Sequence, residues 1–280
     1  SGSLSEHIEA KVAAEENEII DFSALDKLDQ VSGEKTANRT HLVGDGNYYA
    51  LLIGINNYLF MEKLKTPIHD VQVLAQTLKR YYGFTTRLLQ DPTRAEILTA
   101  FNNYRNILKP QDNFLIYYAG HGWLDTAADE GYWFPVDATQ KNEINWISNS
   151  SITSTIRAMK AKHIMVVADS CYSGKLTRGL DISRNTPDYY SQMVHKKARV
   201  VLSSGGVEPV ADRGGRGGHS VFSSAFLKAL LENKGIMEGT ELFNKIRRSV
   251  VLNTDQTPEY ADIRKAGHEG GDFLFIRRKN

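Results

Sequence analysis

Residues 114–122 read FLIYYAGHG, and residues 163–174 read HIMVVADSCYSG. In each stretch an apolar run stops in small residues and then presents one reactive side chain, His121 in the first and Cys171 in the second. Short apolar runs of this kind are typical of strands that are buried on both faces of a sheet. The two stretches therefore predict two central strands, and the rest of the chain is interpreted outward from them.

Further apolar runs alternate with segments of helical periodicity. Thr66 followed by Pro67 predicts the start of a helix with Thr66 as its N-cap, and residues 93–96 (TRAE) form a capping box. The predicted strands are 48–55, 84–89, 114–119, 131–136, 163–168, 199–203 and, at an edge, 273–276. Further helical segments are predicted around 152–159, 222–230 and 242–250. This order predicts an α/β fold with a mostly parallel central sheet of about six strands and helices on both faces.

The composition excludes several classes of protein. The chain has 280 residues, of which 41% are hydrophobic, so it can bury a large core and is neither fibrous nor disordered. Cys171 is the single cysteine, which excludes an intramolecular disulfide and favours a reducing, cytoplasmic location. The net charge of +1 gives no reason to expect nucleic acid as a partner. No apolar run predicts a membrane span or a signal peptide.

The even charge hides an acidic N-terminal arm. Residues 1–46 hold ten acidic and four basic side chains, a balance of −6, which leaves +7 for residues 47–280. Ser1-Gly2-Ser3 is typical of a cloning remnant. We therefore expect an arm over 1–46 and one domain over 47–280. The arm is interpreted either as a solvated acidic tail or as an inhibitory or docking segment that lies on the basic body.

A thiol and an imidazole at the ends of neighbouring strands indicate nucleophilic catalysis. In parallel sheets, ligands bind beyond the carboxyl ends of the strands. A thiol becomes a strong nucleophile as the thiolate, for which a nearby histidine supplies the base and the counter-charge. The main-chain N–H groups of Gly122 and Cys171 would form an oxyanion hole. The alternative is an inert core cysteine beside a structural histidine.

Residues 117–122 (YYAGHG) and 169–174 (DSCYSG) resemble the histidine and cysteine motifs of caspase-like peptidases, with the metacaspase-like branch as the nearest match. Four supporting stretches resemble the same family in the same order: 51–58 (LLIGINNY), 131–137 (GYWFPVD), 218–222 (GHSVF) and 270–273 (GGDF). The resemblance implies the caspase-hemoglobinase fold. It also implies that Cys171 is the nucleophile and that His121 is the general base and acid of a dyad oriented mainly by backbone.

Charge near the dyad suggests which residue precedes the cleaved bond. Caspases proper have Gln-Ala-Cys-Arg-Gly at the nucleophile, whereas Asp169 stands here in place of that glutamine. Asp70 matches an aspartate at the start of the first helix of metacaspase-like proteins, although His69 replaces the asparagine before it. By resemblance the two aspartates line the first substrate pocket, which would select Arg or Lys. The alternative is that Asp70 caps or pairs on its own helix and that Asp169 hydrogen-bonds loop amides.

Two further groups of residues carry predictions about the substrate and about self-cleavage. Ser203 and Ser204, after a predicted strand, resemble the wall whose backbone pairs with an extended substrate, although ordinary loop serines are the alternative. Residues 175–197 lie where family members have a subunit junction, and this segment offers basic residues for self-cleavage: Arg178, Arg184, Lys196 and Lys197. The glycine-rich stretch 212–218 is a second candidate, and simple exposed connections are the alternative.

The sequence predicts no cofactor, with calcium as the one alternative. Some metacaspases need calcium, and a partial acidic cluster is available in Asp125, Asp129, Glu130 and Asp137, in a pattern that departs from theirs. The two RGG units within 212–218 are too short for an avid nucleic-acid site. Phosphate-loop, dinucleotide and zinc-protease motifs are absent from the sequence.

The sequence thus predicts a cysteine endopeptidase that cuts protein or peptide substrates after Arg or Lys through an acyl-enzyme. Two other classes stay open. One is a regulatory or interaction module of caspase fold with little activity. The other is a different cysteine hydrolase or acyltransferase. The sequence predicts no oligomeric state.

Overall fold

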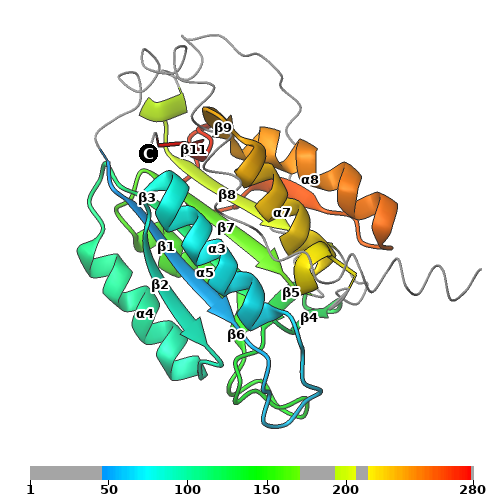
Figure 1. Cartoon of the computed structure of the whole chain (residues 1–280). Helices are drawn as coiled ribbons and strands as arrows, with labels where there is room; N and C mark the ends of the chain where they lie inside the picture. The colour runs from blue at the N-terminus through cyan, green and yellow to red at the C-terminus, as the bar shows by residue number, and fades with distance from the viewer. Residues whose placement is uncertain (1–45, 171–192, 206–213, 279–280) are drawn as a thin grey trace, which may run out of the picture.

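A six-stranded sheet forms the centre of the computed structural model, which describes residues 46–170, 193–205 and 214–278. The strand order is β10-β8-β7-β3-β1-β2 (Figure 1). Its parallel strands are β1 (Tyr48–Gly54), β2 (Thr85–Gln90), β3 (Asn113–Ala119), β7 (His163–Asp169) and β8 (Ala198–Ser203). The mostly parallel α/β sheet expected from the apolar runs is confirmed.

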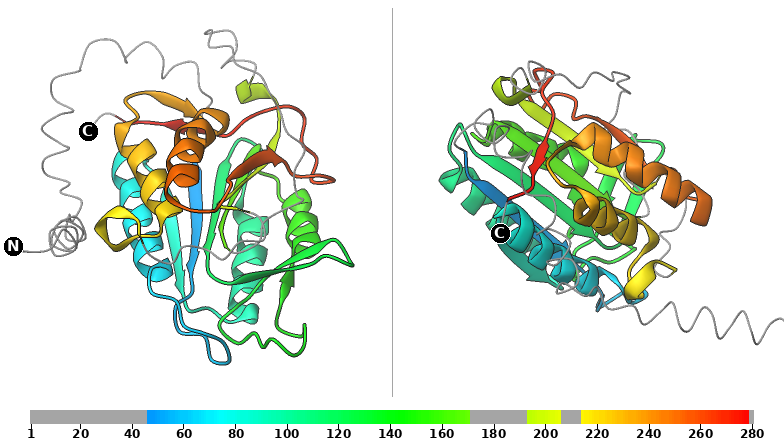
Figure 2. Two further views of the ribbon diagram at one scale, coloured as in Figure 1. Left: turned by 90° about the vertical axis from the view of Figure 1, so that its right-hand side faces the viewer. Right: turned by 45° about the horizontal axis from the view of Figure 1, so that its top comes forward.

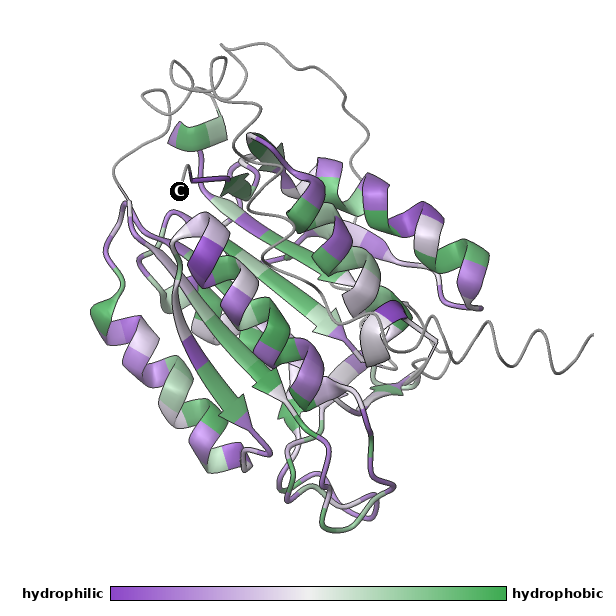
Figure 3. Cartoon of the chain, in the orientation of Figure 1, coloured by the Kyte–Doolittle hydropathy of each residue, from purple (hydrophilic) through white to green (hydrophobic). Residues whose placement is uncertain are grey.

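Helices cover both faces of the sheet because strand residues alternate between them. Ala50 and Leu52 of β1 pack in one core with α3 (Pro67–Tyr82), α7 (Val221–Glu232) and α8 (Gly239–Asn253). Leu51 and Ile53 pack in a second core with α4 (Arg94–Ile107) and α5 (Asn149–Ala158). The left view of Figure 2 shows the two helical layers on opposite sides of the strands. Figure 3 shows mostly hydrophobic residues along the central strands and a mixture of hydrophilic and hydrophobic residues along the helices.

Both predicted helix starts are confirmed, but only one of them has a side-chain capping hydrogen bond. The Thr93 hydroxyl accepts from the Glu96 N–H, and the Glu96 carboxylate accepts from the Thr93 N–H, which completes the capping box of α4. Pro67 does begin α3, but the Thr66 side chain makes no capping hydrogen bond. Thr66 has helical dihedral angles, which turn its hydroxyl away from the first free N–H groups.

The C-terminal strand prediction is wrong in its pairing. Residues 274–276 form β11 (Leu274–Ile276), which pairs antiparallel with β9 (Ile236–Glu238) in a separate two-stranded sheet. The edge of the main sheet is instead β10 (Glu259–Asp262), antiparallel to β8. An edge strand needs no long apolar run, so the polar sequence of β10 gave no signal.

A small antiparallel sheet follows directly after His121. It consists of β4 (Gly122–Asp125), β5 (Glu130–Trp133) and β6 (Ile147–Ser148). The extended segment predicted at 131–136 corresponds to β5, whereas β4 and β6 were not predicted. Trp133 and Ile147 anchor this sheet in the core that also contains α4 and α5. The short helix η2 (Arg216–Gly218) precedes α7.

The predicted acidic arm lies outside the described residues except for Gly46. The helices of the described ranges are all too short or too polar to cross a bilayer.

Candidate active site

The carboxyl ends of β3 and β7 lie side by side at the centre of the sheet. Ala119 pairs with Asp169 in register, and the Gly120 N–H donates to the Asp169 carbonyl at 3.2 Å. Beyond these ends, Gly122 lies so close to Ser170 that an added Cβ would be 3.3 Å from the Ser170 Oγ. The segments that carry His121 and precede the cysteine are therefore held in register. Cys171 itself lies outside the described residues.

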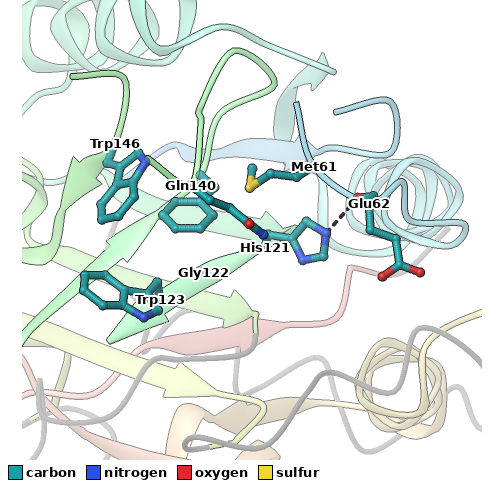
Figure 4. Close-up of a pocket in the computed structure, with 8 residues that line it drawn as sticks. Met61, Glu62, His121, Gly122, Trp123, Gln140 and Trp146 are labelled. Atoms are coloured by element: carbon teal, nitrogen blue, oxygen red, sulfur yellow. Dashed lines mark hydrogen bonds between the residues drawn. The ribbon is translucent and has the colours of Figure 1, made fainter. Parts of the chain in front are cut away.

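The ring of His121 is fixed by a main-chain carbonyl. Its Nε2 lies 2.9 Å from the Glu62 carbonyl oxygen, which can only accept, so Nε2 carries the proton in this contact (Figure 4). The ring also packs on Tyr58, with 4.7 Å between the ring centroids. The remaining ring nitrogen, Nδ1, is then the acceptor in the neutral imidazole, as a general base requires.

Two tyrosine hydroxyls hold the main chain of His121. The Tyr58 Oη accepts from the His121 N–H at 2.7 Å. The Tyr118 Oη donates to the His121 carbonyl at 2.5 Å, and the Phe134 N–H donates to the same oxygen at 3.1 Å. Tyr58 and Tyr118 are buried, so this support is shielded from water.

Gly120 leaves room for both hydroxyls, which makes it a test of this support. A Cβ at position 120 would stand 2.6 Å from the Tyr58 Oη and 2.9 Å from the Tyr118 Oη. Gly120→Ala should therefore displace the tyrosines and shift His121, with a loss of kcat of about 10–100-fold. Gly235→Ala is the matched control because a Cβ there meets nothing within 4 Å. Equal kcat for the two variants in a peptidase assay would contradict this role.

The Gly122 N–H points out of the hairpin formed by β4 and β5. The Phe134 N–H donates to the His121 carbonyl, so His121 and Phe134 form a hydrogen-bonded pair. Because such pairs alternate along antiparallel strands, the next pair, Gly122 and Trp133, has no hydrogen bonds between its two residues. In such a pair the N–H groups face away from the partner strand. The Gly122 N–H is thus not bonded to β5 within the hairpin, and its role in an oxyanion hole stays a prediction.

The structure brings Asp70 and Asp169 together at the start of α7. The Ser220 N–H donates to Asp70 Oδ2 at 3.3 Å, and the Ser220 hydroxyl donates to Asp169 Oδ2 at 2.6 Å. His219 Nδ1 lies 2.5 Å from Asp70 Oδ1, and its ring stacks on His69. Among the described residues, Asp70 thus accepts from the main-chain N–H of Ser220 rather than from its own helix, and Asp169 accepts from the hydroxyls of Ser220 and Ser223. Both side chains are buried, so they form one acidic group inside the protein.

Asp169 has one carboxylate oxygen to spare. Its Oδ2 accepts from Ser220 and Ser223, but its buried Oδ1 accepts no hydrogen bond from the described residues. The Ser204 hydroxyl faces the same carboxylate, although without bonding geometry. Burial and then the charge of Asp70 raise the pKa of Asp169 to about 7, against the lowering effect of the Ser220 hydroxyl.

The raised pKa of Asp169 predicts that the free energy of unfolding depends on pH. Between pH ~4 and ~7 the folded chain binds a proton at Asp169 that the unfolded chain has lost. The free energy of unfolding should therefore fall as the pH rises through this window. Asp169→Asn should remove this decrease in the free energy of unfolding. The difference in that free energy between Asp169→Asn and the parent should therefore change in favour of the variant by about 1–4 kcal/mol from pH 4 to pH 8. Urea unfolding measures this, with exposed Asp255→Asn as the control. Parallel pH curves for parent and Asp169→Asn would refute the prediction.

Ser203 and Ser204 are both buried beside this group. Ser203 pairs with Ala168 on one side and with Glu259 of β10 on the other, so its backbone is shared between two strands. The Ser204 N–H donates to the Ala168 carbonyl at 3.0 Å. Their role as a wall for an extended substrate stays a prediction, and the β10 pairing limits what Ser203 can offer.

The residues predicted for self-cleavage fall in two places. Arg178 and Arg184 lie outside the described residues. Lys196 and Lys197 are exposed and directly precede β8. They therefore lie at the amino-terminal ends of the parallel strands, whereas His121 follows a carboxyl end. The six residues of β8 separate these lysines by about 20 Å from the carboxyl ends of the strands. Self-cleavage at Lys196 or Lys197 would therefore have to occur between molecules or before folding.

The four carboxylates considered for calcium do not form one cluster. Asp125 accepts from the N–H groups of Ala127 and Ala128 in its own turn. Glu130 accepts from Ser150, and Asp137 accepts from the Arg94 N–H at 3.0 Å. Within the described ranges, no three His, Cys, Asp or Glu side chains gather as a metal site. The dependence of activity on calcium stays a prediction.

The comparisons with known proteins agree with this arrangement. The family model described as Caspase domain matches residues 47–266, which is most of the chain. The chain belongs to the caspase family. The resemblance of the histidine and cysteine motifs to this family is thereby confirmed, and so is the caspase fold.

Metacaspases are among the relatives of this caspase-family chain. It is 28% identical to metacaspase-1A of Aspergillus oryzae and 27% identical to metacaspase-1 of Emericella nidulans, with 84% of the chain covered in each case. The alignments cover 61% and 63% of those proteins, so the chain spans less than two thirds of their length.

Solved structures share the fold at lower identity. Caspase-1 from Spodoptera frugiperda matches with a TM-score of 0.58 and 14% identity, over 85% of this chain and 93% of that one. A protein from Geobacter sulfurreducens matches with a TM-score of 0.55 and 18% identity, over 80% and 97%. Identities this low establish the common fold alone.

Sequence reasoning missed the residues that support the site. Tyr58 and His219 both lie in stretches that resemble the family, but neither carried an expected role. Glu62 acts through its main-chain carbonyl, which no side-chain pattern could reveal. Trp123 and Trp146 line a cavity beside His121, and the signal for them was the density of aromatic residues after the histidine.

Proposed function

We propose that this chain is a cysteine endopeptidase that hydrolyses peptide bonds after Arg, and less well after Lys. The observation that carries the proposal is the register of β3 and β7, with His121 beyond one strand end and Ser170 beyond the next. Because Cys171 directly follows Ser170 in the sequence, this register supports a dyad of Cys171 and His121.

The proposed reaction has two steps. His121 Nδ1 accepts the thiol proton while the sulfur of Cys171 attacks the carbonyl carbon of the scissile bond. The Gly122 N–H, together with that of Cys171, stabilises the negative oxygen that forms. His121 then donates the proton to the leaving amine, which gives a thioester. Water hydrolyses the thioester with His121 again as base, and the thiol is restored.

The preference for a basic residue rests on the acidic group of Asp70 and Asp169. Asp169 Oδ1 is a buried carboxylate oxygen that accepts no hydrogen bond from the described part of the chain, and such an oxygen is a strong acceptor for a guanidinium or an ammonium group. Two neighbouring carboxylates also repel an aspartate side chain, which would carry a like charge into a buried site. Arg should exceed Lys because its planar fork can bond to more than one acceptor.

A panel of fluorogenic peptides tests this function. The peptides carry Arg, Lys, Asp or Ala before the cleaved bond and are incubated with the chain and with Cys171→Ala, with and without calcium. We expect turnover in the order Arg, Lys, then Ala and Asp, and none by Cys171→Ala. Faster turnover of the Asp peptide would refute the pocket. No turnover under either condition would refute the peptidase and favour an interaction module.

A further inference from the structure

A cavity of about 480 Å³ opens beside His121, on the side away from the acidic group. Its walls come from the loop after β1 (Met61 and Glu62), from His121 itself, and from the aromatic residues Trp123 and Trp146. Figure 4 shows the two indole rings at one end of this space and His121 with Glu62 at the other. A concave, mostly apolar space of this size is typical of a ligand-binding site.

The floor of the cavity is a packed aromatic cluster rather than a mobile surface. The ring centroids of Trp146 lie 4.7 Å from Phe134 and 5.2 Å from Trp123. The indole N–H of Trp146 donates to the Thr139 carbonyl at 2.7 Å, which fixes the ring. Trp123 is nevertheless 41% exposed, because it forms the open wall. Such a pre-formed aromatic wall binds apolar side chains at little cost in side-chain entropy.

The cavity and the acidic group lie on opposite sides of the central sheet. Asp70 and Asp169 meet at Ser220, at the start of α7, whose residues belong to the core on one face. Phe134 and Trp146 belong to the core on the other face. A substrate peptide whose basic side chain binds to Asp70 and Asp169 must therefore pass over the carboxyl ends of the strands, next to His121, in order to reach the cavity.

The chemistry of the dyad sets the direction of that peptide. His121 must stand next to the leaving nitrogen in order to donate a proton to it. The part of the substrate that follows the scissile bond therefore leaves past His121. His121 and Gly122 also form part of the cavity wall. The space is thus on the leaving-group side of the bond.

We propose that this cavity is a subsite for a bulky apolar side chain, aromatic or long aliphatic, at the first or second residue after the scissile bond. This inference rests on the proposed peptidase function. The loop that supplies Met61 and Glu62 also exposes the apolar side chains of Leu59 and Phe60. Glu62 is the charged residue in the wall, so an acidic side chain is disfavoured.

Internally quenched peptides with Arg before the cleaved bond test the subsite. The two residues after the bond are Phe-Gly, Gly-Phe, Gly-Gly or Asp-Gly in otherwise identical peptides. We expect kcat/KM for the better Phe peptide to exceed that for Gly-Gly by about tenfold, with Asp-Gly the poorest. Trp123→Ala and Met61→Ala should each reduce this Phe advantage and leave Gly-Gly cleavage unchanged.

Leu252→Ala is the matched control, because it removes another exposed apolar side chain (72% exposed) on α8, away from the cavity. It should keep the full Phe advantage. Equal rates for Phe and Gly peptides, or an equal loss for all peptides in Trp123→Ala, would overturn the subsite and leave the peptidase standing. Cleavage of none of the peptides by the parent chain would overturn both.

Discussion

His121→Ala should lower kcat/KM for an Arg peptide by at least about 100-fold, and by up to about 10⁴-fold. The variant loses the proposed base for the thiol proton and the proposed acid for the leaving amine. The ring makes one polar contact with the fold, to the Glu62 carbonyl, while its main-chain bonds to Tyr58 and Tyr118 do not depend on the side chain. The loss should therefore be catalytic rather than structural.

A second readout separates these two causes. Without His121, the pH at which iodoacetamide alkylates Cys171 at half its maximal rate should rise toward about 8.5, the value of an unperturbed thiol. His195→Ala, at an exposed position outside the site, is the control and should alter neither kcat/KM nor the alkylation profile. An unchanged alkylation profile in His121→Ala would argue that the imidazole does not interact with the thiol.

Asp70→Asn should lower kcat/KM for Arg and Lys peptides by about 100-fold or more. Asparagine has nearly the same shape and keeps one acceptor oxygen, which can serve His219 or the Ser220 N–H but not both, and it removes one negative charge from the acidic group. The attraction for a cation then falls, while the shape of the pocket is kept. Cleavage of the Ala peptide and alkylation of Cys171 should stay unchanged, since neither depends on that charge.

Asp70→Ala is the companion variant that tests the packing. It also leaves His219 and the Ser220 N–H without their acceptor, so it should lose Arg cleavage and some stability. Retention of Arg cleavage at the parent rate in Asp70→Asn would mean that Asp70 serves only to position His219.

The strand ends of the site are predictable because their signals are local. The apolar runs before His121 and Cys171 indicate buried strands, and the glycines after them indicate where those strands stop. The alternation of runs and helical segments then suffices to infer a parallel sheet whose carboxyl ends meet. For this reason the sequence predicts that the segments with His121 and Cys171 meet at one end of the sheet, whereas the pocket role of Asp169 is implied by the resemblance.

The supports of the site are not predictable in the same way. Asp70 and His219 stand 149 residues apart, and no spacing rule connects them. The Glu62 carbonyl carries no sequence signal at all. Thr66 shows that a residue favoured at a cap can lack the capping hydrogen bond when its backbone is helical. Strand β10 shows that an edge strand can be too polar to be predicted from an apolar run.

The most direct test of the account is active-site labelling followed by intact mass measurement. A peptidyl chloromethyl ketone with Arg at its reactive end should add once per chain, and the label should map to Cys171, the single cysteine. The matching Asp reagent should react far more slowly, and the label should be lost in Cys171→Ala. Equal labelling by the Arg and Asp reagents, or a label on another residue, would contradict an arginine-directed peptidase built on Cys171 and His121.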